Sequence, residues 1–127
     1  MSTRDLWALA VVALVIVAGC TRRLPSPEGY DSLEARDVLV TALDAWKRRD
    51  LKSLVSRAPP IRFVDDDERA GLQLADYAFG DKAATDLGRF EGFDVNLTLK
   101  NRQGETITRA ASYQVSLDPL AVLRSDP

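Results

Sequence analysis

The segment from Leu6 to Ala18 is an unbroken apolar run, and it constrains this chain more than any other feature of the sequence. It contains no charged residue, no glycine and no proline. Such a run is poorly solvated by water and has to meet lipid or the translocation machinery. Its length of thirteen residues is that of a signal-peptide core and falls short of the roughly 18 to 20 residues of a comfortable membrane span. We therefore expect residues 1–19 to be a cleaved signal peptide.

A four-residue motif closes this run. Val17-Ala18-Gly19-Cys20 resembles the lipobox of bacterial lipoproteins, in which an aliphatic residue and two small residues precede a cysteine. The resemblance implies that Cys20 receives a diacylglyceryl group, becomes the first mature residue and is then acylated, for example by palmitate. It also implies a lipid-anchored protein of the cell envelope that faces the periplasm. Thr21 does not resemble the aspartate that retains some lipoproteins in the inner membrane, which slightly favours the outer membrane.

The charges around the run leave one alternative open. Arg4 is offset by Asp5, and Arg22-Arg23 follow the expected cleavage point, where positive charge resists translocation. An uncleaved single-span protein with its domain inside the cell is therefore the alternative placement.

The composition excludes several classes of function. The formal net charge is −2 and the basic residues are interspersed with acidic ones, so we expect no nucleic-acid partner. A single cysteine cannot form an intramolecular disulfide, and the absence of histidine removes the usual proton shuttle and the commonest transition-metal ligand. We expect residues 20–30, which contain two prolines, to form a tether and residues 31–127 to form one domain.

Helical patterns come first in the expected domain. Asp31 is placed to cap a helix, with Glu34 three residues later as in a capping box. Apolar residues then recur at steps of three and four and form one stripe: Ala35, Val38, Leu39, Ala42, Ala45 and Trp46. Lys47-Arg48-Arg49 are interpreted as cations that complement the helix dipole, and a patch for phosphate or lipid headgroups is the alternative. Asp50 is expected to cap a shorter helix through Ser56, with Leu51, Leu54 and Val55 facing inward.

Strand patterns follow Pro59-Pro60. Short runs at residues 61–64 and 72–79 favour strands, and the alternation of the second slips near Ala75, which predicts a bulge. Regular alternation over residues 93–100 and 105–117, with turn residues at 101–104, predicts an antiparallel hairpin. Arg109 alone interrupts the apolar parity of the last strand. We expect Pro119 to end the ladder or mark an edge, with a frayed tail beyond it.

This order of elements predicts an α+β fold, with a signal helix followed by one or two helices packed on a curved antiparallel sheet of about four strands. The domain resembles the cystatin-like and nuclear-transport-factor-2-like folds and small uncharacterised bacterial lipoproteins. The matching segments are Ala45-Trp46-Lys47, Pro59-Pro60-Ile61, Gly71-Leu72-Gln73-Leu74 and Tyr113-Gln114-Val115. Because these are core and turn residues, the resemblance implies a fold and not a reaction.

Two groups of residues are candidates for chemistry. The acidic run Asp65-Asp66-Asp67-Glu68 lacks the glycine-centred spacing of a calcium loop and is interpreted as a solvated turn, so we expect no metal and no cofactor. Asp76, Tyr77 and Tyr113 could line a pocket in the mouth of a cone fold, although adjacent strand residues point to opposite faces.

No nucleophile with a partner base is evident, because the chain has no histidine and its one thiol is assigned to lipid. We therefore expect a non-catalytic module that binds an envelope protein or a small ligand. The alternative is a cone-fold enzyme or small-molecule carrier with a pocket lined by tyrosine and aspartate.

Overall fold

The computed structural model describes the backbone of residues 28–126 and the side chains of residues 33–126. The lipobox residues Val17, Ala18, Gly19 and Cys20 lie outside the described residues, as does most of the expected tether. Among the helices of residues 28–126, none is both long enough and apolar enough to cross a membrane. The described elements are α2 (Glu28–Lys47), α3 (Lys52–Ser56), β1 (Arg62–Val64), α4 (Asp66–Arg69), β2 (Gln73–Phe79), β3 (Thr85–Asp86), β4 (Glu91–Lys100), β5 (Thr106–Leu117) and β6 (Leu120–Arg124).

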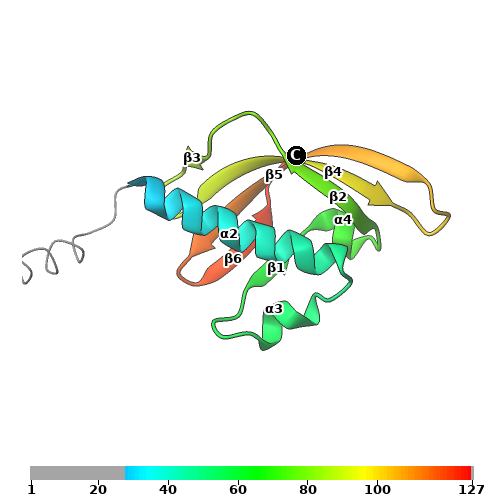
Figure 1. The fold of residues 1–127 in the computed structure, drawn as a ribbon, viewed down its shortest axis with the longest axis horizontal. Helices are drawn as coiled ribbons and strands as arrows, with labels where there is room; N and C mark the ends of the chain where they lie inside the picture. The colour runs from blue at the N-terminus through cyan, green and yellow to red at the C-terminus, as the bar shows by residue number, and fades with distance from the viewer. Residues whose placement is uncertain (1–27, 127) are drawn as a thin grey trace, which may run out of the picture.

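The helices and strands form two layers, with α2 lying across one face of a single sheet (Figure 1). The sheet has six strands in the order β1-β6-β5-β4-β2, and β3 pairs with the start of β4. β1 runs parallel to β6, whereas the other pairs are antiparallel. The expected α+β class is confirmed, but the expectation of an antiparallel sheet of about four strands is corrected to a mixed sheet of six.

The strand β6 is the main element that the sequence analysis missed. Pro119 was expected to end the ladder, yet Asp118 and Pro119 form a tight turn and Leu120 pairs back with Leu117. A proline is tolerated here because a turn residue needs no amide hydrogen for the ladder. The residues after it therefore continue the sheet instead of fraying, and β6 also provides the edge on which β1 pairs.

The hairpin of β4 and β5 is confirmed with an uninterrupted antiparallel register from Glu91↔Val115 to Lys100↔Thr106. Its far end projects beyond α2 at the right of Figure 1. The predicted bulge is also confirmed, because the register of β2 on β4 shifts between Leu74 and Asp76. The extra residue there lets both Leu74 and Tyr77 lie on the face that α2 covers.

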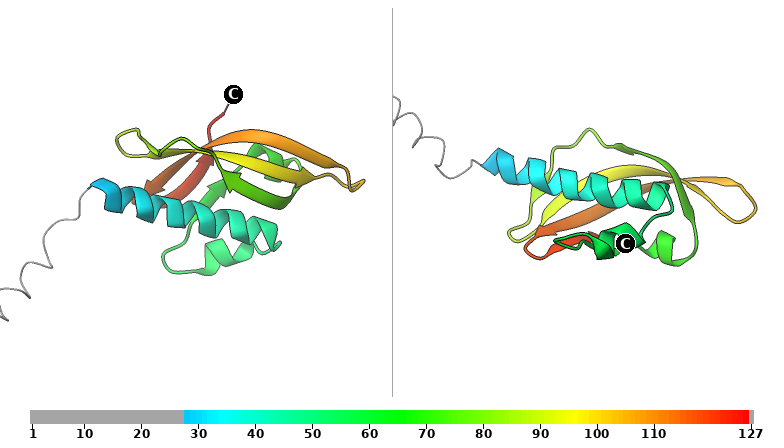
Figure 2. Two further views of the ribbon diagram at one scale, coloured as in Figure 1. Left: turned by 45° about the horizontal axis from the view of Figure 1, so that its top comes forward. Right: turned by 60° about the horizontal axis from the view of Figure 1, so that its bottom comes forward.

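The apolar stripe of α2 packs on the inner face of the sheet, as predicted, and both views of Figure 2 show the helix against that face. Within the described side chains of α2, the buried residues run from Ala35 to Trp46. The helix starts at Glu28, one turn before the expected cap at Asp31. Capping patterns locate a helix end only approximately, which explains the difference. The strands contribute the rest of the core: Leu74, Phe93, Val95, Leu97, Leu99, Ala111, Tyr113, Val115 and Val122.

The short helix α3 departs from the sequence expectation in two ways. Its N-cap position is Leu51 and not Asp50, and no side chain caps it. Val55 was expected to face inward but is 76% exposed, whereas Leu54 is buried. A helix of five residues presents only about one turn to the core, so only one of two consecutive apolar residues can face it.

Candidate functional site

The acidic run after β1 is not a solvated turn, and that interpretation is wrong. Asp65 is the N-cap of α4 and is only 1% exposed. Its Oδ1 accepts hydrogen bonds from the backbone N–H groups of Asp67, at 2.8 Å, and of Glu68, at 3.1 Å. The sequence pattern is therefore a helix start, in which aspartate satisfies amides that have no partner within the helix.

Asp65 is also the centre of a buried polar cluster. Tyr113 on β5 donates its hydroxyl proton to Asp65 Oδ2. Arg124 on β6 places Nη1 at 3.2 Å from both carboxylate oxygens. Tyr113 and Arg124 face each other across the β5–β6 pair on the inner side of the sheet, and the guanidinium lies 5.7 Å from the centre of the Tyr113 ring.

Arg124 extends this cluster to two further carboxylates. Its Nη1 donates to Asp67 at 2.9 Å, and its Nε and Nη2 donate to the two oxygens of Asp126. Asp126 in turn accepts a hydrogen bond from the Ser112 backbone N–H at 3.0 Å. The carboxyl-terminal residues are thereby held against β5.

Arg109 completes the group, which we call the Asp65 network: Asp65, Asp67, Arg109, Tyr113, Arg124 and Asp126. Arg109 Nε lies 3.0 Å from Asp67 Oδ2. In the sequence this arginine interrupted the apolar parity of β5, and the structure shows that it stays on the inner face to reach α4. A charged residue at an inward position, together with the acidic helix cap, was the sequence signal that could have located the network.

Two members of the Asp65 network, Tyr113 and Arg124, have raised pKa values, so near neutral pH the tyrosine stays protonated and the arginine stays charged. Burial, followed by the adjacent Asp65 charge and its hydrogen bond, raises the pKa of the Tyr113 hydroxyl above its usual value. Burial lowers the pKa of Arg124, but its hydrogen bonds to Asp126 and Asp67 outweigh that and raise it overall. Among the described residues, no buried side-chain polar atom lacks a hydrogen-bond partner. The cluster therefore joins α4, β5 and β6 through hydrogen bonds that satisfy one another.

The three residues considered for a pocket are not brought together. Tyr113 is buried on Asp65, whereas Tyr77 donates its hydroxyl proton to Asp44 of α2 at 2.7 Å. Burial and the Asp44 hydrogen bond raise the pKa of Tyr77 to about 12. The Asp76 side chain is 71% exposed and lies 3.5 Å from Lys47 Nζ. Each of the three residues therefore has a different partner.

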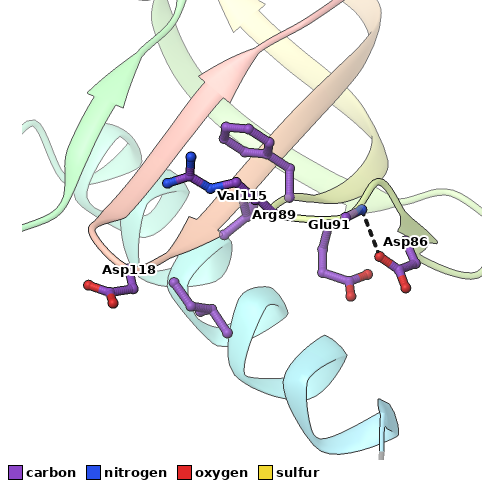
Figure 3. A pocket seen from close by; sticks show the side chains of 8 residues that line it. Asp86, Arg89, Glu91, Val115 and Asp118 are labelled. Atoms are coloured by element: carbon purple, nitrogen blue, oxygen red, sulfur yellow. Dashed lines mark hydrogen bonds between the residues drawn. The ribbon is translucent and has the colours of Figure 1, made fainter.

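A cavity of about 370 Å³ opens beside the ends of β4 and β5 (Figure 3). Val115 contributes part of its wall, and the carboxylates of Glu91 and Asp118 lie on opposite sides of it in the figure. Arg89 lies between them, and Asp86 accepts a hydrogen bond from the Gly88 N–H at 2.9 Å. The size of this cavity is within the range of ligand pockets, but its charged lining residues are of both signs and favour no one class of ligand.

No group of three or more aspartate, glutamate, cysteine or histidine side chains is placed to hold a metal ion within the described part of the chain. Two carboxylates of the acidic run, those of Asp65 and Asp67, are bound by arginine instead.

Comparison with protein-family models, with characterised proteins and with solved structures finds no match to this chain. The function proposed below is therefore argued from the residues of this chain and their geometry.

Proposed function

We propose that this protein is a lipid-anchored lipoprotein of the bacterial cell envelope and that its α+β domain is a non-catalytic binding module facing the periplasm. The observation that carries the proposal is the lipobox-like quartet Val17-Ala18-Gly19-Cys20 at the end of an apolar run of signal-peptide length. The proposal includes a cystatin-like or nuclear-transport-factor-2-like fold, and the long helix on one face of the sheet supports it.

The proposed anchor is physically sufficient. Each buried methylene contributes about 0.8 kcal/mol, so two or three acyl chains on Cys20 give stable attachment where a single chain binds reversibly. Only residues 21–27 separate Cys20 from the first residue of α2. Even fully extended, this segment reaches at most about 30 Å, which keeps the domain close to the membrane surface. The outer membrane remains slightly favoured because Thr21 follows the cysteine.

The side chains of the domain favour binding over catalysis. Tyr113, Asp65 and Arg124 satisfy one another, and the chain has no histidine to act as a base. Because α2 covers one face of the sheet, the opposite face of β4 and β5 stays open to a partner. Exposed small and polar residues line that open face: Asp94, Asn96, Thr106, Thr108 and Ala110. The rival function, a small-molecule carrier on the same fold, is supported by the cavity of Figure 3.

The intact mass of the protein extracted from its native membrane tests the anchor. We expect a chain that begins at Cys20 and carries the mass of the attached acyl groups. The Cys20→Ala variant should lose this added mass and remain uncleaved. Thr21→Ala serves as the matched control, since it changes the neighbouring residue and leaves the thiol in place.

An unmodified full-length mass for the unaltered protein would refute the lipid anchor and favour the uncleaved single-span alternative. A reporter fused to the carboxyl terminus separates these placements independently. It would be active only outside the cytoplasm if the proposal holds and only inside it for the single-span protein.

A further inference from the structure

An arginine occupies a position at the end of α2 where a glycine is usual. Arg49 has a φ of 59°, in the left-handed region that side chains disfavour. Its N–H donates to the Trp46 carbonyl at 3.1 Å, and the Asp50 N–H donates to the Ala45 carbonyl at 2.8 Å. These are the two hydrogen bonds of a Schellman motif, in which the left-handed residue is commonly glycine. A costly residue at such a position points to a use for its side chain.

Arg49 lines a cavity of about 360 Å³ between the end of α2 and the start of β2. We call this the Arg49 cavity, and its lining residues are Trp46, Arg49, Leu51, Lys52, Glu68, Gly71, Leu72 and Gln73.

Hydrogen bonds hold the walls of the Arg49 cavity in place. Trp46 Nε1 donates to the Leu72 carbonyl at 3.1 Å, which joins the helix to the strand opposite. Gln73 Nε2 donates back to the Trp46 carbonyl at 2.8 Å. The cavity is therefore formed before any ligand arrives, which lowers the entropic cost of binding.

The charges of the Arg49 cavity favour an anion. Its lining residues include two basic ones, Arg49 and Lys52, and one acidic one, Glu68. Within residues 33–126 neither cation takes part in an ion pair, in contrast to Arg109 and Arg124. A carboxylate, phosphate or sulfonate can accept charge-assisted hydrogen bonds from such groups.

We propose that the Arg49 cavity binds a small organic anion. Its acidic group would lie between Arg49 and Lys52, and its aromatic or branched apolar part would lie against Leu51 and Leu72, next to the buried Trp46. The volume is that of a small-molecule pocket and accommodates one ring system with a side group. This inference rests on the proposal that the domain is a binding module and is independent of the lipid anchor.

The test compares 1-naphthaleneacetate with its neutral amide, 1-naphthaleneacetamide, on the full-length ¹⁵N-labelled chain in lipid nanodiscs. The readout is the indole N–H cross-peak of Trp46, which is distinguished from that of Trp7 by its loss in Trp46→Phe. We expect the acid to shift this peak with saturation and the amide to bind at least about tenfold more weakly, since a hydrogen bond to a charged group is lost.

Arg49→Gly should weaken binding of the acid by about tenfold or more while leaving the melting temperature equal or higher, because glycine accepts the left-handed conformation without strain. Lys52→Gln is the second variant and should weaken binding without any backbone change. Arg102→Gly, which removes one positive charge from the exposed turn between β4 and β5, is the matched control and should change nothing.

Three outcomes would overturn the inference: no saturable shift of the Trp46 peak with the acid, equal affinity for acid and amide, or full affinity in both Arg49→Gly and Lys52→Gln. None of these outcomes bears on the mass of the lipid-modified chain. The anchor and the anion site can therefore fail separately.

Discussion

Two groups of charged side chains in this domain differ sharply, the one around Asp65 and the one around Arg49. In the Asp65 network the Arg124 side chain is only 5% exposed, and it contacts the carboxylates of Asp65, Asp67 and Asp126. In the Arg49 cavity the arginine is exposed and, within the described side chains, has no carboxylate partner. The first region uses its charges to join α4 to the sheet, whereas the second leaves its cations available to an external anion.

The difference follows from desolvation. A charge taken out of water loses several kcal/mol of hydration and has to recover it from partners within the fold. An exposed guanidinium keeps its hydration and has no desolvation cost until a ligand displaces the water. Burial and pairing, rather than residue type, therefore separate a structural arginine from a binding one in this protein.

The largest effect that separates the two regions is expected from one substitution made at both arginines. Arg124→Met leaves the buried Asp65 carboxylate without its cation and should lower the free energy of unfolding by about 3 to 5 kcal/mol. Arg49→Met removes an exposed charge and should change it by less than about 0.5 kcal/mol. Urea denaturation of the two variants measures the difference. Equal effects at the two positions would contradict the contrast drawn between the regions.

A smaller effect is expected from the two tyrosines. Tyr113→Phe removes a buried hydrogen bond to Asp65 and should lower the free energy of unfolding by about 1 to 3 kcal/mol. Tyr77→Phe removes the hydrogen bond to Asp44 at a partly exposed position and should cost less than about 1 kcal/mol. The same urea experiment reads both. A larger loss for Tyr77→Phe would place the main polar contact of the domain under α2 and not in the Asp65 network.

The smallest effect is the dependence of stability on alkaline pH. The pKa of Tyr77 is raised to about 12 and that of Tyr113 is also raised, whereas a tyrosine in the unfolded chain titrates near about 10. Above that pH the unfolded chain loses protons that the folded chain keeps, so the free energy of unfolding falls as pH rises. Urea midpoints at pH of about 9 and about 10.5 measure this decline.

Tyr113→Phe should make the alkaline decline less steep, because one of the two retained protons is gone. If the alkaline decline in stability is unchanged in both Tyr113→Phe and Tyr77→Phe, groups other than these tyrosines cause it.

Asp126 affects stability at the acidic end of the pH range. Burial raises its pKa, but the hydrogen bonds from Arg124 and from the Ser112 N–H outweigh this and lower it overall. Its contribution is thus present near neutral pH and is lost as the solution becomes acidic.

Much of the fold could be predicted from local patterns. The stripe of α2, the β4–β5 hairpin and the bulge near Ala75 follow from periodicities of 3.6 and 2 that are visible over a few residues. Strand β6 could not be placed in the same way, because Pro119 is a strand terminator by local rules and a turn residue in the actual register. The parallel pairing of β1 with β6 joins residues about sixty positions apart and has no local signature.

The candidate sites divide along the same line. The expected grouping of Asp76, Tyr77 and Tyr113 used residue types that suit chemistry, but the bulged edge strand and the buried β5 give them separate partners. The Asp65 network had only faint signals, namely an acidic helix cap and Arg109 at an inward position. The Arg49 cavity had only the cationic run Lys47-Arg48-Arg49, for which an ordinary helix end was preferred over an anion-binding patch.

The sequence by itself determined the apolar run, the lipobox-like motif, the amphipathic helix and the alternating hairpin, because each depends on neighbours within a few residues. Only the tertiary structure decided that Asp65 and Arg124 are buried together while Arg49 and Lys52 remain exposed. Burial and pairing depend on which distant segments the sheet brings together, and a charged side chain in the sequence is the same in either case.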